Sequence, residues 1–186
     1  MRKIDEKKQL AIKQAAIQLV CTAGLTNLTT AKVTKTAGVS PATLYIYYQD
    51  KTDMLSRLYE EVKDQLHAGS GEVLAAAPTL DDKIRALLRF SVRQFQRFPQ
   101  ETQFVNVLWS NPEVLDAQAV KHGSMTDGIL KQLMEAIEAA SEFAPTTATE
   151  LEILFSVPGQ VASRAGDLTD MQLDQLIEKI LRAVRA

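Results

Sequence analysis

The chain has 186 residues, of which 46% are hydrophobic and 24% are charged, and its formal net charge is −2. It has no apolar run of about eighteen residues that could span a bilayer, and its N-terminal MRKIDEKK lacks the apolar core of a signal peptide, so we expect a cytoplasmic protein. One cysteine, two histidines and the absence of any nucleophile motif or nucleotide fingerprint argue against a disulfide framework, a metal site, a cofactor and an enzyme.

The first predicted helix ends at Gly24. Its apolar residues recur at helical spacing and are Ile12, Ala15, Ala16, Leu19 and Val20. Cys21 lies on the same helix. We interpret it as a small packing residue in preference to a redox sensor, because a sensing thiol needs a basic and exposed setting.

Residues 28–53, LTTAKVTKTAGVSPATLYIYYQDKTD, predict two short helices separated by a tight turn. Thr29 caps the first of them, and Gly38 supplies a left-handed stop. Ser40 then caps the second helix, and Pro41 occupies its first turn, where the missing amide costs nothing. The pattern is that of a helix-turn-helix.

The second of these helices has features of a DNA-recognition helix. Leu44 and Tyr48 are four residues apart and anchor it inward. The side chains that this places toward solvent or a partner are Thr43, Tyr45 and Tyr47. Small residues at the helix start, Pro41 and Ala42, allow close approach to a phosphate or a base edge. Alternatively, the tyrosine rings only cover the surface of their own domain.

Charge is distributed unevenly along the chain. Residues 1–52 carry eight basic and three acidic side chains, net +5, whereas the other 134 residues have a net charge of −7. A basic end attached to an acidic body can neutralise phosphates locally. A lysine-rich N-terminus is often only a solvated tail, but Lys32, Lys35 and Lys51 lie outside it.

Residues 12–55, with AGVSPATLYIYYQDKTDML as their most distinctive block, resemble the DNA-binding domain of the TetR family of bacterial transcription regulators. The resemblance implies a homodimer that binds a palindromic double-stranded operator through two successive major grooves. It also implies recognition contacts from the second helix, backbone contacts from the first, and a phosphate contact from the start of the next helix. The residues that the resemblance places at these contacts are Thr30, Lys32, Thr43, Tyr45, Tyr47 and Lys51. The other predicted DNA-binding residues lie at the starts of the two helices and are Thr29, Ser40, Pro41 and Ala42.

The domain boundary is predicted after the fourth helix, which Asp50 and Asp53 bracket at its start. His67 to Pro78 is rich in glycine, serine and alanine and is interpreted as a linker. We therefore expect an all-α protein of about nine helices. Residues 5–65 would form the helix-turn-helix domain with the start of a connecting helix, and residues 66–186 a ligand-sensing and dimerisation domain.

Five helices are predicted after residue 79. Thr79 with Asp82 caps the first, and Pro99 opens the second. The third opens at Asn111 and Pro112. Thr146 or Thr147 caps the fourth, and Thr169 with Gln172 caps the last.

A small-molecule cavity is expected among the three helices between residues 79 and 140. Its candidate lining residues are Phe90, Gln94, Phe104, Leu108, Trp109, Met125, Leu133 and Met134. The same residues also suit an ordinary helical core. Four arginines recur every fourth residue and are interpreted as a solvated or interhelical salt-bridging face in preference to an anion site; they are Arg85, Arg89, Arg93 and Arg97.

The last two helices are the predicted dimer surface, again with the family resemblance added. The candidate residues are Leu151, Phe155, Gly159, Ser163, Leu173, Leu176, Ile177 and Ile180. The alternative is that this stripe packs on its own domain. Pro158 is expected to kink its helix.

Three functions follow from these patterns. The first is a ligand-responsive repressor that a small molecule of unknown identity releases from its operator. The second is a DNA-binding regulator of the same fold that a protein partner controls, without a small-molecule ligand. An enzyme is the third, but no catalytic pattern supports it.

Overall fold

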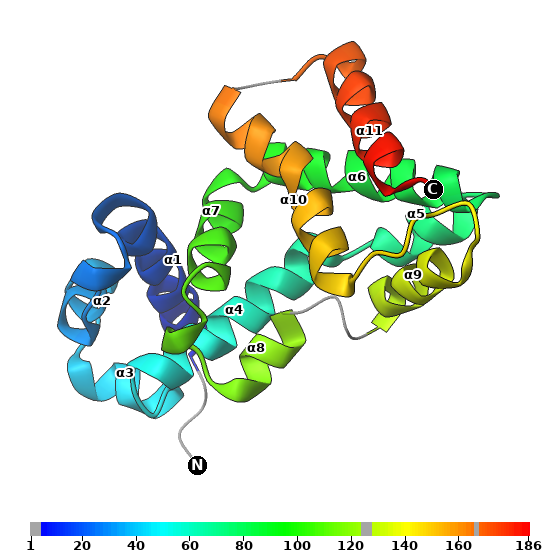
Figure 1. Cartoon of the computed structure of the whole chain (residues 1–186). Coiled ribbons are helices and arrows are strands. Elements are labelled where there is room, and N and C mark those ends of the chain that lie inside the picture. Colours follow the sequence, from blue (N-terminus) through cyan, green and yellow to red (C-terminus); the bar gives the residue numbers. More distant parts are fainter. Residues whose placement is uncertain (1–4, 124–127, 166–167) are drawn as a thin grey trace. The chain divides into compact units, whose positions relative to one another are not determined.

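The computed structural model describes residues 5–123, 128–165 and 168–186, without the side chains of residues 128, 129, 163 and 165. Within this part of the chain the regular elements are helices, and one isolated antiparallel bridge joins Phe143 to Arg185 (Figure 1). The predicted all-α class is confirmed. No described helix is long and apolar enough to cross a bilayer.

The helices group into two compact units. The first comprises residues 1–63 and 100–123, and the second comprises residues 64–99 and 124–186. The chain therefore leaves the first unit, returns to it and leaves it again. Residues 100–123 had been assigned to the C-terminal domain from their position in the sequence, and the structure places them with the N-terminal helices instead.

The first unit is built on α1 (Glu6–Ala23), which packs against α2 (Thr30–Ala37). α1 ends at Gly24, whose φ of 77° favours glycine, and a 3-10 turn (Leu25–Asn27) follows. The expected core positions of α1 are buried apart from Leu19, which is half-buried. The remaining N-terminal helices are α3 (Pro41–Tyr47) and α4 (Lys51–His67).

The returning segment contains α7 (Pro99–Trp109), a 3-10 turn (Pro112–Val114) and α8 (Ala117–Gly123). The expectation of one helix from Asn111 onward was wrong, because Pro112 opens only this turn and α8 is followed by a separate α9 (Gly128–Ala139).

Three contacts join α4 to α8 and to Asp116, the residue that precedes α8. The Asp116 N–H donates to Ser56 Oγ at 2.9 Å, and Lys63 Nζ donates to the Gly123 carbonyl. Between them, Gly123 faces the Tyr59 ring so closely that a Cβ at this position would lie 2.7 Å from Tyr59 Cε1. Tyr59 is itself only 1% exposed, so its ring has little room to move.

The second unit begins with α5 (Ser70–Ala76), which occupies most of the predicted linker. The linker interpretation was wrong because Leu74 and Ser70 are buried and alanine is the strongest helix former, so the segment has both a packing face and local propensity. Gly69, with φ of 92°, precedes the helix.

α6 (Leu80–Arg97), α10 (Ala148–Ala165) and α11 (Asp170–Val184) follow, and the predicted caps at Thr79, Thr147 and Thr169 are present. Thr79 Oγ1 accepts from the Asp82 N–H at 3.1 Å, and Thr169 forms a full capping box with Gln172. In Figure 1, α10 and α11 both lie against α6.

The residues predicted for a dimer surface are mostly part of the core of the second unit. Those buried there are Leu151, Phe155, Leu173, Ile177 and Ile180. Leu176 packs partly against them, and the side chain of Ser163 lies outside the described residues. Gly159 is also used internally, since a Cβ there would lie 2.8 Å from Cδ2 of Phe95 on α6. The predicted apolar periodicity is correct, but these side chains pack against other residues of their own chain.

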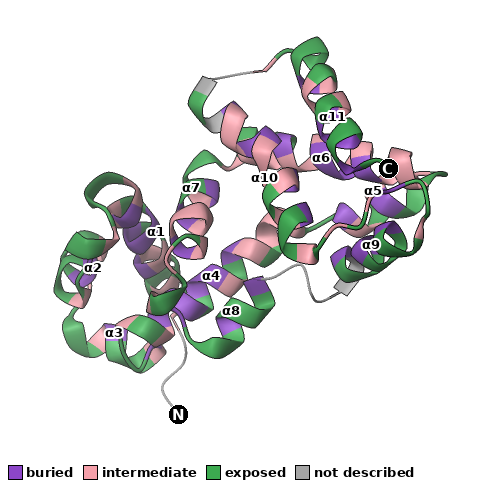
Figure 2. Cartoon of the chain, in the orientation of Figure 1, coloured by how far each residue is buried: buried purple, intermediate pink, exposed green. Residues whose placement is uncertain are grey.

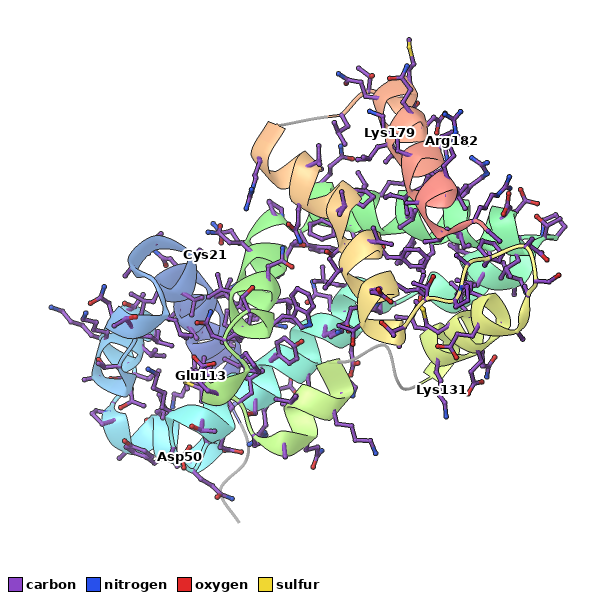
Figure 3. All side chains as sticks on the ribbon, in the orientation of Figure 1. Cys21, Asp50, Glu113, Lys131, Lys179 and Arg182 are labelled. Carbon is purple, nitrogen blue, oxygen red and sulfur yellow. The ribbon has the colours of Figure 1, made fainter. Side chains whose placement is uncertain are left out.

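The arginine face of α6 forms interhelical ion pairs. Arg85 pairs with Glu178 and Arg89 pairs with Asp174, both on α11. The hydrogen bond from Arg85 lowers the pKa of Glu178 below its ordinary value. Figure 3 shows Lys179 and Arg182 on the same helix, both exposed. The salt-bridging interpretation is confirmed for the first two arginines.

The close approach of Gly123 to Tyr59 predicts the sign of a substitution. Gly123→Ala should lower the free energy of unfolding by about 1–3 kcal/mol, because the new methyl group overpacks a buried contact. If the added methyl group met no atom of Tyr59, replacing a helical glycine by alanine would instead stabilise the protein by up to about 1 kcal/mol. Urea denaturation followed by circular dichroism measures the difference.

Two further variants make this test specific. Tyr59→Phe removes the hydroxyl that meets the added methyl group, so Gly123→Ala should cost less in that background. Val120→Ala, at an exposed position of the same helix, should change stability by less than about 0.5 kcal/mol. A stabilising Gly123→Ala would show that α8 does not approach Tyr59 this closely.

Candidate nucleic-acid interface

The turn between α2 and α3 is fixed by local hydrogen bonds. Thr29 Oγ1 accepts from the Lys32 N–H at 3.2 Å, which caps α2. Gly38 ends that helix with φ of 66°. Ser40 Oγ accepts from the Thr43 N–H at 3.1 Å, and Pro41 begins α3. The predicted helix-turn-helix, with both of its caps and its glycine stop, is confirmed.

Two buried side chains hold α3 against its unit, as predicted. Leu44 is 0% exposed and Tyr48 is 2% exposed. Burial raises the pKa of Tyr48 to about 12, although the nearby Arg57 partly opposes this shift. The Arg57 guanidinium lies 5.1 Å from the centroid of the Tyr48 ring and also donates to the Tyr47 carbonyl at 2.5 Å. Sequence reasoning missed this arginine, which holds the C-terminal end of α3 from α4.

The outer side of α3 follows from these anchors. Successive residues of a helix are about 100° apart, so Ala42 and Ile46 point away from the Leu44 and Tyr48 side. Ile46 is 50% exposed and its neighbour Tyr45 is 54% exposed. Figure 2 shows most of α3 in the colour of exposed residues. Ile46 was not among the predicted contacts, although its position opposite the anchors was readable from the sequence.

Tyr47 does not point freely into solvent. It is half-buried, and its hydroxyl accepts from the N–H of Asp5 and donates to the carbonyl of Asp5, both at 3.1 Å. Its position lies about 60° from Leu44 around the helix, nearer to the anchored side than to the outer side. The expectation of an outward Tyr47 was therefore wrong, and the ring ties the start of α1 to the end of α3.

The other predicted DNA-binding residues lie around the ends of three helices. Thr30 is half-buried at the start of α2, whereas Lys32 is exposed and donates to the Asn27 carbonyl at 2.9 Å. Pro41 is exposed at the first position of α3 and Thr43 is half-buried. Lys51 is half-buried at the first position of α4.

Asp50 and Asp53 fix the start of α4 reciprocally. The Asp53 N–H donates to Asp50 Oδ1 at 2.9 Å, and the Gln49 N–H donates to Asp53 Oδ2 at 2.8 Å. Figure 3 shows Asp50 at the junction of α3 and α4. The start of α4, with Lys51, is thereby held in a fixed position after α3.

Comparison with known proteins agrees with this geometry. A family model described as "Bacterial regulatory proteins, tetR family" matches residues 12–58. Residues 12–58 therefore form a domain of the TetR family. The matched segment runs from α1 into α4 and contains the whole helix-turn-helix, so the resemblance noted in the sequence is confirmed.

One curated relative of this chain is the HTH-type transcriptional regulator BetI of Rhizobium meliloti (strain 1021). It is 28% identical over 97 residues, which are 52% of this chain and 48% of the relative, so the match spans about half of that protein.

Two solved structures are similar over almost their whole length. A TetR family transcription regulator from Marinobacter aquaeolei VT8 has a TM-score of 0.83 at 22% identity, covering 100% of this chain and 99% of that one. A TetR-family transcriptional regulator from Haemophilus influenzae RD has a TM-score of 0.75 at 19% identity, with 100% of both chains covered. Such identities show the shared fold. These proteins are transcription regulators and not enzymes, in agreement with the expectation for this chain.

The predicted ligand-pocket residues are divided between the two units. Phe104 and Leu108 are buried in the first unit. Leu133 and Met134 belong to the core of the second. Trp109 is half-buried on α7, Phe90 and Gln94 are half-buried on α6, and Met125 lies outside the described residues. Neither unit therefore contains the whole predicted set.

Two further expectations concern the Cys21 thiol and the binding of a metal ion. Cys21 Sγ lies 3.4 Å from the Gln100 carbonyl and donates to it, and partial burial raises the pKa of this thiol. A raised pKa disfavours the reactive thiolate. Across residues 5–123, 128–165 and 168–186, no group of three His, Cys, Asp or Glu side chains is placed to hold a metal ion.

The Tyr47 contact predicts a local effect of one hydroxyl. Tyr47→Phe should speed amide hydrogen exchange at the start of α1 while lowering the global free energy of unfolding by only about 0.5–1.5 kcal/mol, because two backbone partners return to water. Exchange followed by NMR or mass spectrometry on the free protein measures this. Tyr45→Phe, at an exposed position of the same helix, is the control and should leave exchange there unchanged. Equal protection from amide exchange in the wild type and in both variants would contradict the role of the Tyr47 hydroxyl in holding the start of α1.

Proposed function

We propose that this protein is a homodimeric, sequence-specific DNA-binding transcription regulator of the bacterial cytoplasm. In this proposal it acts as a repressor that leaves a palindromic operator when a small molecule binds. The observation that carries the proposal is the capped helix-turn-helix, with the outer side of α3 exposed and small residues at its start.

The chemistry of α3 and its surroundings suits the major groove. Pro41 and Ala42 are small and exposed, so the positive end of the helix dipole can come close to a phosphate or a base edge. The residues 1–52 that contain this motif carry a net charge of +5. Lys32 and Lys51 are assigned to phosphates, while Thr43 and Tyr45 are assigned to the groove. Tyr47 is assigned a positioning role through Asp5 in place of direct contact.

A palindromic operator requires two copies of α3, and the outer face of α10 is the surface proposed to join them. Ile153 on this face is 50% exposed, on the side of the helix opposite the buried Leu151 and Phe155. Next to it, a surface hollow of about 300 Å³ is lined by Val157, Gln160, Val161 and Arg164. We therefore propose the exposed side of α10 as the dimer surface, in place of the predicted residues on its buried side.

Control by a small molecule is supported by one polar atom on α6. Gln94 Oε1 is buried and has no hydrogen-bond partner among the described residues. A buried amide oxygen costs about 1–3 kcal/mol when it is left unpaired, so a ligand that offers an N–H or O–H group would gain from this position. Ligand and operator would then weaken each other's binding equally. Control by a protein partner is the second candidate, because Leu133 and Met134 fill the core of their own unit.

Fluorescence anisotropy tests DNA binding directly. The full-length protein should bind one palindromic duplex from the promoter of its own gene or from a random library about a thousandfold more tightly than a non-specific duplex. Lys51→Ala should weaken this binding and lower the slope of log affinity against log salt by about one unit per subunit, since one phosphate contact is lost. Lys131→Ala, on α9, is the matched control and should change neither. Uniform weak binding to all duplexes would contradict sequence-specific recognition.

Light scattering tests the dimer. Ile153→Glu should shift the protein from dimer to monomer at micromolar concentration, because a charge enters the centre of the apolar contact. Met171→Glu, at a 70% exposed position on α11, should leave the dimer intact. The monomeric variant should keep its helical content yet bind the palindrome much more weakly. A dimer that persists in Ile153→Glu would place the interface elsewhere.

A further inference from the structure

We infer that Ile46 and Ala42 form an apolar strip on α3 that contacts the C5 methyl group of a thymine in each operator half-site. This inference rests on the proposed function and adds to it the chemistry of one base pair. It names a specificity-determining residue that the resemblance did not supply.

Ile46 lies on the exposed side of α3. Leu44 and Tyr48 fix the buried side of α3, and Ile46 lies on the diametrically opposite side, one turn beyond Ala42. An isoleucine that is 50% exposed there contributes little to its own core. Any helix that enters the groove with the buried anchors facing away presents this strip to the bases.

The apolar side chain of Ile46 selects the chemistry of its partner. Isoleucine has no donor or acceptor, so it cannot read the polar edges of a base. In the major groove the apolar feature of the bases is the C5 methyl group of thymine. The net charge of +5 on residues 1–52 favours a polyanion over an apolar protein surface as the occupant of this face.

Two hydroxyl groups near Ile46 have hydrogen-bond partners within the chain. The Tyr47 hydroxyl is bonded to the backbone of Asp5, so it is occupied within the chain. Thr43 Oγ1 is 2.9 Å from Ser40 Oγ, within the cap of the helix. The second turn of α3 therefore offers the groove the exposed Ile46 and Tyr45. Apolar contact there carries more of the base recognition than the number of tyrosines suggests.

The experiment starts from the tightest duplex that the full-length protein selects from a random library. Each thymine of that duplex is replaced in turn by deoxyuridine, which removes only the methyl group. At one symmetry-related thymine per half-site the loss should weaken binding about fourfold, the value of one buried methyl group. Anisotropy at constant salt measures the ratio.

Protein variants then assign the methyl effect. Ile46→Ala should bind the thymine and deoxyuridine duplexes equally, whereas Ile46→Val should keep part of the difference. Val120→Ala, which also shortens an exposed apolar side chain in the same unit, should keep the full ratio. Circular dichroism should show unchanged helical content in all three variants, since the substituted positions are exposed.

The possible results separate the two proposals. A specific duplex with no sensitive thymine, or an Ile46→Ala variant that keeps the fourfold ratio, overturns the Ile46 assignment and leaves the proposed function standing. A selection that yields no specific duplex contradicts the proposed function itself.

Discussion

The burial of Leu44 and Tyr48 is the constraint on which the exposed outer side of α3 depends. These two side chains fix the rotation of α3 about its own axis, and this rotation decides which residues face outward. Contacts from α1 and α4 then hold the far end of the helix: Asp5 binds the Tyr47 hydroxyl, and Arg57 binds the Tyr47 carbonyl. A helix of seven residues has little stability of its own, so these contacts replace length as the source of order.

The same principle of external support applies to α4. Its start is fixed by Asp50 and Asp53, while farther along Ser56, Tyr59 and Lys63 connect it to the segment that ends in α8. α4 therefore shares its position with α3 at one end and with α8 at the other, all within the first unit. A displacement of α4 would strain both sets of contacts.

Sequence reasoning succeeded where the determining interactions are local. Thr29, Gly38 and Ser40 act within three or four residues of their own positions, so the turn and both caps were predictable. It failed where the partner is distant in sequence. The Tyr47 hydroxyl binds a residue 42 positions away, and no periodicity encodes that contact. The helix in residues 70–76 was not predicted, because glycine and serine are typical of a linker and the sequence alone does not show that Leu74 is buried.

Gly159 shows why a small-residue pattern alone does not identify an interface. A glycine in a helix permits close approach, but the sequence does not say whether the approaching group belongs to the same chain or to a second copy. In α10 that group is the Phe95 ring of the same unit, so the buried side of the helix is satisfied. What remains is the exposed Ile153 on the opposite side. Ile46 on α3 is exposed for the same reason, because the buried Leu44 and Tyr48 lie on the opposite side of the helix. In the function proposed above, a palindromic operator requires both a DNA-recognition helix and a second copy of the chain, and the two exposed isoleucines are the surfaces proposed for these two contacts.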